Sequence, residues 1–292
     1  MKKARKVLTC MGVAVCAAAV MVEATTAALV TIDFETDDNG NPLVNGQAIS
    51  SFARADRSGV PFSTDTVLEF GTLLTVDETI QGSDGHLGPV IFDSTPNGPN
   101  QNSQDPDLLV DKGNILILQS DNPASATTTT LDATYGLLFD NPNDEADFAD
   151  HGSIVFDFLN PVEPVSIDLI DINGGAHVTV TLTDVGGLQR VYDVPTKWTT
   201  DVTNAPAGWQ TLFLNTLNPQ PAEPNATGND ATVIQNDVGF DSTAVIQLDV
   251  LFDGSPSSAG MDNLVFIVPE PATVMLLGLG LLAMVRRGCG RC

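Results

Sequence analysis

The feature that most constrains the fold is a series of short β-type runs with almost no helical periodicity between them. Leu29–Glu35 alternates apolar and polar residues, and similar runs recur as far as Met261–Val268. Clusters of Gly, Pro, Asn and Asp, such as residues 173–175, separate these runs. Short strands divided by turn signals favour an all-β sandwich. The expected strands span residues 29–35, 67–76, 114–119, 153–159, 165–172, 177–183, 188–194, 209–214, 243–252 and 261–268.

The central region must be stabilised by its apolar core, because it contains no cysteine for a disulfide. All four cysteines lie before residue 17 or after residue 288. About 240 residues are enough for one core, so we expect a single domain over 29–267, with a boundary near Pro161–Pro164 as the alternative. The expected large core residues are Phe34, Phe70, Phe156, Phe158, Phe213, Phe252 and Phe266.

The N-terminus has the pattern of a secretory signal peptide. Four basic residues among the first six precede an uncharged run over 7–22, and small residues follow at 24–28. A positive start, an apolar helix and a small-residue cleavage site are the three parts of such a signal. We therefore expect residues 1–28 to direct the chain through the Sec export machinery and to be removed after Ala28.

The C-terminus has a second three-part pattern. Pro269-Glu270-Pro271 stops the folded chain, because closely spaced prolines fit neither a helix interior nor a central strand. Residues 272–285 are apolar or small, and Arg286 and Arg287 follow them. Fourteen helical residues span about 21 Å of a bilayer core of about 30 Å, which suits a short, transient transmembrane helix in the inner membrane. An ordinary membrane anchor and a buried apolar strand are the alternatives.

Pro269-Glu270-Pro271, the apolar segment and the arginine pair together resemble the PEP-CTERM sorting signal of Gram-negative bacteria. The resemblance covers residues 268–292 and implies recognition by an exosortase, an integral-membrane cysteine protease that removes the tail. It also implies delivery to the cell surface or to the exopolysaccharide matrix of a biofilm.

A second resemblance concerns the region between the two signals. Ile32–Glu35, Gly113–Gln119 and Met261–Phe266 resemble blocks of jelly-roll ectodomains, which are similar to carbohydrate-binding modules of the galactose-binding type. The expected fold is therefore a jelly-roll-like β-sandwich, flanked by a signal-peptide helix and a short C-terminal transmembrane helix.

The charge of the central region excludes one class of partner. Residues 29–268 contain 5 basic and 35 acidic residues. Nucleic-acid binding requires Lys and Arg to neutralise phosphates, so we expect no nucleic-acid partner. A field this negative attracts divalent cations.

Acidic residues near both ends of the central region predict a calcium site. Asp33 and Glu35 alternate on the opening strand, and Asp262 and Asn263 lie on the closing one. If the first and last strands pair, these oxygen ligands meet, and calcium binds six to eight oxygens. A solvated acidic edge is the alternative explanation of the same residues. A second candidate group comprises Asp93, Asp105 and Asp107.

The sequence gives no positive sign of catalysis. The central region has no Gly-x-Ser-x-Gly elbow and no cysteine nucleophile, and its three histidines lack zinc-ligand spacing. Trp198 and Trp209 flank one loop and are the candidate aromatic platforms for a sugar. We expect a non-enzymatic structural or adhesive protein of the cell surface or matrix. The alternative is a carbohydrate-binding module attached to exopolysaccharide, and a polysaccharide-active enzyme is less favoured.

Overall fold

The computed structural model describes ten stretches of the chain. These are residues 27–37, 40–49, 74–81, 86–101, 106–120, 129–143, 151–199, 208–224, 226–254 and 259–269. Within the chain, Leu29–Val268 form one compact unit. The expected signal-peptide helix and the C-terminal segment from Glu270 onward lie outside the described residues.

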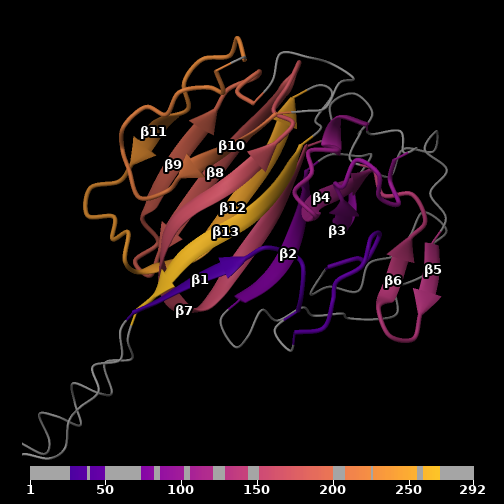
Figure 1. Ribbon diagram of the computed structural model, residues 1–292. Coiled ribbons are helices and arrows are strands. Elements are labelled where there is room, and N and C mark those ends of the chain that lie inside the picture. The colour runs from indigo at the N-terminus through magenta and orange to yellow at the C-terminus, as the bar shows by residue number, and fades with distance from the viewer. Residues whose placement is uncertain are drawn as a thin grey trace, which may run out of the picture. The chain divides into compact units, whose positions relative to one another are not determined.

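The described residues form an all-β fold with one short 3-10 helix, η2 (Pro106–Leu108), which confirms the predicted fold class (Figure 1). The strands are β1 (Ala28–Ile32), β2 (Leu74–Gln81), β3 (His86–Asp93), β4 (Asn114–Ser120), β5 (Thr129–Asp132), β6 (Gly136–Phe139), β7 (His151–Ile170), β8 (Ala176–Asp184), β9 (Gln189–Val194), β10 (Trp209–Phe213), β11 (Thr232–Asn236), β12 (Val245–Gly254) and β13 (Gly260–Val268).

The long strand β7 belongs to both halves of the sheet system. Its first part pairs with β12 and β2, and its last part pairs with β13 and β10. The first half therefore has the order β11-β9-β8-β12-β7-β2, and the second half has the order β10-β7-β13-β4-β3. Pro161 and Pro164 lie where β7 changes partners, at positions where a missing N–H is tolerated. The strand thus runs through the stretch considered as a domain boundary.

Apolar side chains from the two halves meet in one core. Phe156 and Val250 of the first half belong to the same buried cluster as Leu169 and Met261 of the second half. Phe158 and Phe266 pack edge to face at 5.2 Å between ring centroids. Burying each large apolar side chain stabilises the fold by about 1.5–3 kcal/mol, so this shared core holds the two halves together as a sandwich.

The predicted phenylalanine core is correct at most of the described positions and wrong at one. Phe34, Phe156, Phe158, Phe252 and Phe266 are buried, and Phe70 lies outside the described residues. Phe213 is 50% exposed, because the neighbouring Leu212 and Leu214 face the core. Alternation along β10 therefore turns Phe213 outward together with Trp209.

A second apolar cluster covers part of the outer face of the second half. Val90, Ile117 and Ile170 point away from the main core and contact Leu137 and Phe139 of the β5–β6 hairpin. Residues 40–49 fasten this layer through backbone hydrogen bonds to Ile91 and Phe139. The layer lies over the β3–β4 side of the sheet. At the other edge, β10 carries exposed aromatic residues.

Gly46 lies very close to the backbone of Phe139 in this layer. Its φ is +79°, and a Cβ atom there lies only 2.0 Å from the carbonyl oxygen of Phe139. We expect Gly46→Ala to lower the free energy of unfolding by about 2 kcal/mol or more, through backbone strain and loss of this pairing. Gly40→Ala is the matched control, because Gly40 has a φ of +77° with nothing within 4 Å. Urea unfolding measures both variants. If Gly46→Ala and Gly40→Ala lower the free energy of unfolding equally, the steric explanation is wrong.

Candidate ligand groove on β10

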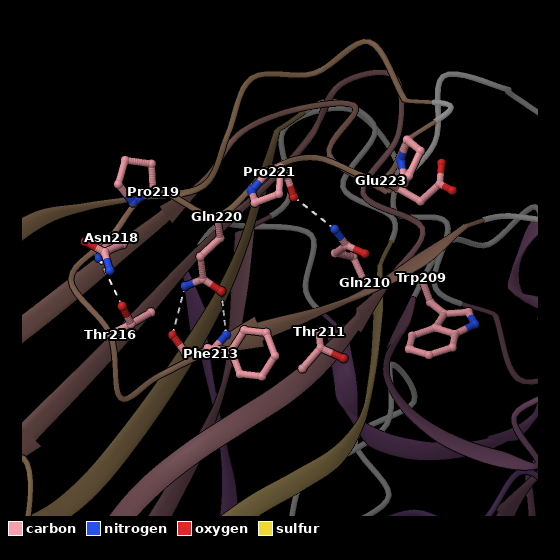
Figure 2. A pocket seen from close by; sticks show the side chains of 11 residues that line it. Trp209, Gln210, Thr211, Phe213, Thr216, Asn218, Pro219, Gln220, Pro221 and Glu223 are labelled. Atoms are coloured by element: carbon pink, nitrogen blue, oxygen red, sulfur yellow. Dashed lines mark hydrogen bonds between the residues drawn. The ribbon is translucent and has the colours of Figure 1, made fainter.

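An open groove of about 760 Å³ lies along the outward face of β10 (Figure 2). Trp209, Thr211 and Phe213 occupy alternate positions of the strand and therefore point to the same face, whereas Leu212 faces the core. The segment 216–224 forms the facing wall. The lining residues are Trp209, Gln210, Thr211, Phe213, Thr216, Asn218, Pro219, Gln220, Pro221, Glu223 and Pro224.

Gln220 joins the wall to the strand. Its side-chain Oε1 accepts a 2.7 Å hydrogen bond from the backbone N–H of Phe213, and its Nε2 donates a 2.8 Å hydrogen bond to the Phe213 carbonyl. The amide thus pairs with β10 as a neighbouring strand residue does (Figure 2). Gln220 is buried, and its backbone pairs with Ala231. These contacts hold the groove in one shape before any ligand binds.

Two further features stiffen the wall. Pro219, Pro221 and Pro224 restrict its backbone, because each proline fixes φ near −65°. The Gln210 side chain donates a 2.9 Å hydrogen bond to the carbonyl of Pro221. A pre-ordered wall reduces the entropy lost when a ligand binds.

Replacing Gln220 with Glu is expected to destabilise the unit by about 1–3 kcal/mol. The carboxylate cannot donate to the Phe213 carbonyl, which leaves a partly buried acceptor unpaired beside a charge. Gln210→Glu removes an exposed hydrogen bond and is expected to cost less than about 1 kcal/mol. Urea unfolding measures the stability of both variants. If Gln220→Glu leaves the free energy of unfolding unchanged, Gln220 does not join the wall to the strand.

Beside the groove, Trp209 is in contact with a charged cluster. The Lys112 ammonium lies 3.6 Å from the centroid of the Trp209 ring. The same ammonium is 2.9 Å from Asp168 Oδ2 and 3.6 Å from Asp262 Oδ2. The Nδ2 of Asn263 donates to both of these carboxylate oxygens at 2.9 Å. The cluster therefore couples two carboxylates, one cation and one exposed aromatic ring.

Asp262 is the most perturbed member of the cluster. It is 2% exposed, and its Oδ1 has no hydrogen-bond partner. Burial raises the pKa of the Asp262 carboxyl from 3.8 to about 7, and the charge of Asp168 acts in the same direction. The backbone hydrogen bond from Asn263 and the ammonium of Lys112 oppose this rise in pKa without cancelling it. Asp262 therefore changes its charge near neutral pH.

The structure places the four predicted calcium ligands in two separate groups of contacts. β1 does pair with β13. However, Asp33 accepts a hydrogen bond from the Glu35 backbone, and Glu35 accepts one from the N–H of Asn114. Asp262 and Asn263 instead contact Lys112 and Asp168. Lys112 supplies the positive charge that a cation was expected to provide at Asp262.

In the described part of the chain, no three His, Cys, Asp or Glu side chains are arranged to hold a metal ion. In the second candidate group, Asp93 accepts a hydrogen bond from the Thr95 backbone. Asp107 is buried, and its Oδ1 has no partner. Asp105 lies outside the described residues. Calcium binding stays a prediction from the sequence.

The two candidate tryptophans differ completely in environment. Trp198 is 0% exposed, and its indole N–H donates a 3.3 Å hydrogen bond to the Gln220 carbonyl. It therefore has no face available for a sugar, which corrects its assignment as a platform. Trp209 is 42% exposed and lines the groove. The buried tryptophan supports the groove wall, and the exposed one faces the groove.

Sequence reasoning missed Lys112 and Asp168. One signal was available for each. Lys112 is one of only five basic residues in the region 29–268, so its charge was certain to have acidic neighbours. Asp168 lies between Ile167 and Leu169 in the run Val165–Ile172, so alternation turns it to the face opposite these two apolar residues. Their meeting depends on long-range strand pairing, which no local pattern specifies.

Residues 268–291 match the protein family described as the PEP-CTERM protein-sorting motif. The chain carries a PEP-CTERM sorting motif. It is thus an exported protein, sorted by an exosortase to the cell surface or the extracellular space. Pro269, Glu270, Pro271, Arg286 and Arg287 all fall within the match. Of these, the structure describes only Pro269.

The other comparisons add little to this motif. No curated protein matches it. Among solved structures, the crystal structure of an agarase aligns with a TM-score of 0.27 and 9% identity. The alignment covers 49% of this chain and 22% of the agarase chain. Within the described residues, no helix is both long enough and apolar enough to cross a membrane.

Proposed function

We propose that this PEP-CTERM protein is a non-enzymatic component of the cell surface or matrix that binds neutral polysaccharide through the groove on β10. The observation that carries the proposal is the exposure of two aromatic side chains on one face of one strand. Trp209 is 42% exposed and Phe213 is 50% exposed, and both line the groove. Exposed aromatic rings beside polar groups are typical of a binding surface.

The spacing of the two rings suits an extended chain of sugars. Trp209 and Phe213 are four positions apart on the strand, which corresponds to about 13 Å along β10. Thr211 lies between them, and Gln210 and Asn218 add amide groups to the lining. Two apolar surfaces with hydrogen-bonding groups between them match the ring faces and hydroxyl groups of successive sugar units.

Charge favours a neutral polysaccharide over an acidic one. Among the described residues that line the groove, Glu223 alone carries a charge. The whole region 29–268 has 35 acidic and 5 basic residues, so its field repels a polyuronate. We therefore expect retention on neutral polysaccharide and little retention on acidic polysaccharide.

The proposed non-enzymatic role rests on the position of the carboxylates. Glycoside hydrolysis usually requires two carboxyl groups on either side of the scissile bond. Asp168 and Asp262 form a close pair, but both are buried and neither lines the groove. Among the described residues that line the groove, Glu223 is the single carboxylate available to a ligand at Trp209 and Phe213.

We expect the Trp209→Ala variant to lose affinity for the neutral fraction of host exopolysaccharide by about 10-fold or more. Affinity electrophoresis with purified neutral and acidic fractions measures the effect. Val238→Ala is the matched control, because Val238 is 99% exposed and does not line the groove. Unchanged retention of Trp209→Ala, or equal binding of the acidic fraction, overturns the proposed function.

The route to the surface forms the second part of the proposal. After Sec export, the short apolar tail holds the chain in the inner membrane until exosortase cleavage near Pro269-Glu270-Pro271 releases it. Mass spectrometry of the mature protein tests this route. We expect a C-terminus close to residue 268 in the parent strain and an uncleaved tail in a strain that lacks the exosortase. A full-length mature chain in both strains contradicts it.

A further inference from the structure

We propose that Lys112 is a positioning residue for ligand binding: it covers one face of the Trp209 indole and holds the ring so that the opposite face meets the sugar. This inference rests on the proposed function of the groove. Lys112 does not line the groove, and its side chain is 10% exposed. It therefore acts on the ligand only through Trp209.

Lys112 is held from two sides. A lysine side chain usually moves freely about several bonds, and an exposed ammonium is poorly fixed in space. Here the ammonium lies 2.9 Å from Asp168 Oδ2 and 3.6 Å from Asp262 Oδ2. Both carboxylates are buried, so these ion pairs are weakly screened by solvent. The cation is thus fixed before it contacts the indole.

The contact with Trp209 is close and one-sided. The ammonium is 3.6 Å from the ring centroid, well within the range of a cation–π interaction. Because the ammonium is largely buried, the ring face that it covers is turned toward the protein. Trp209 as a whole is 42% exposed and lines the groove. The ring is therefore sandwiched only when a sugar covers its second face.

The two carboxylates are aligned with the groove by strand register. Asp168 on β7 stands opposite Asp262 on β13 and opposite Thr211 on β10. The Thr211 hydroxyl donates a hydrogen bond to Asp168 Oδ1. Asn263, with a φ of +47°, reaches the Oδ2 atoms of both acids. Thr211, Asp168 and Asp262 thus form a row across β10, β7 and β13 that connects the groove to Lys112.

Fixing the ring in advance raises affinity because the ligand need not immobilise it. Ordering one side chain at an interface reduces affinity by about 3- to 10-fold. We therefore expect Lys112→Met to weaken binding of the neutral exopolysaccharide fraction by this factor. Lys112→Arg keeps the charge and the stacking on the indole, so it should retain most of the affinity.

The protein offers a direct probe of the ring. It contains two tryptophans, and Trp198 does not line the groove. In the Trp198→Phe background, the fluorescence anisotropy decay of Trp209 reports the motion of the ring without any ligand. We expect faster local motion in Lys112→Met and parent-like motion in Lys112→Arg. Fluorotryptophan labelling of the unchanged chain gives the same information by NMR if Trp198→Phe folds poorly.

Lys112→Met leaves two buried acids without their cation, so the variant with Asp168→Asn added serves as a second test. Faster ring motion together with weaker binding in this folded variant supports the proposal. Unchanged ring motion, or weaker binding that Lys112→Arg does not restore, overturns it. If the parent protein binds no neutral polysaccharide, the proposed function fails, and the ring-motion measurement still decides whether Lys112 orders Trp209.

Discussion

Replacement of Trp198 with Ala is expected to lower the free energy of unfolding by about 3–5 kcal/mol. Trp198 is fully buried within the main core, so truncation removes a large apolar surface and leaves a cavity. Its indole N–H and its carbonyl also hold the groove wall, through Gln220 and the backbone N–H of Glu223. Urea unfolding measures the loss.

The same variant should lose ligand binding although Trp198 is closed off from the groove. Loss of the indole anchor and of the packing around it loosens the segment 216–224, so the ligand must then order the wall. Trp198→Phe is the control, because it keeps the aromatic core and loses only the N–H, at a cost of about 1–2 kcal/mol. A loss below about 1 kcal/mol for Trp198→Ala contradicts the packing that we describe.

Asp262→Asn should remove a pH dependence of stability that the parent protein shows between about pH 4 and pH 7. Burial raises the pKa of Asp262 from 3.8 to about 7, so the folded state retains a proton that the unfolded chain releases. Stability therefore falls as pH rises through this window, by about 1.4 kcal/mol per pH unit and about 4 kcal/mol in total. Asn cannot ionise and carries no such cost.

The difference between parent and variant isolates Asp262 from the many other acids. We expect similar stabilities near pH 4 and an Asp262→Asn advantage of about 4 kcal/mol at pH 8. The attraction between Asp262 and Lys112 is already included in this figure, because it contributes to the pKa of about 7. Asp184→Asn is the control. Backbone hydrogen bonds, chiefly from Asp241, lower the pKa of Asp184, so its contribution is lost only in acid. A constant difference across the range refutes the raised pKa of Asp262.

Alternation predicted the regular strands well because each has a buried face and a polar face. The expected runs at 177–183 and 188–194 correspond to β8 and β9. Four strands, β3, β5, β6 and β11, were missed. β5 and β6 have four residues each, too few to show a period, and Gly88-Pro89 interrupts the pattern of β3. β7 was read as two strands, since its prolines resemble a break until their partners are known.

The site was less predictable than the strands. Both tryptophans flank one loop, and nothing local distinguishes the buried one from the exposed one. Trp209 begins a strand whose alternation turns it outward, whereas Trp198 follows β9 into the core. The partner of Asp262 is Asp168, 94 positions away in sequence, because β13 pairs with β7. Such pairings arise from the whole sheet and not from any segment of it.

The double membership of β7 also determines when an exported chain can finish folding. Its partners β10, β12 and β13 all follow it in sequence, and β13 ends at Val268. The first half lacks β12 until Gly254 has been delivered, and the second half lacks β13 until Val268, the residue where the sorting motif begins. Completion of the fold and arrival of the motif therefore coincide. A protease acting at the motif meets a finished sandwich, and not a partly paired chain with open strand edges.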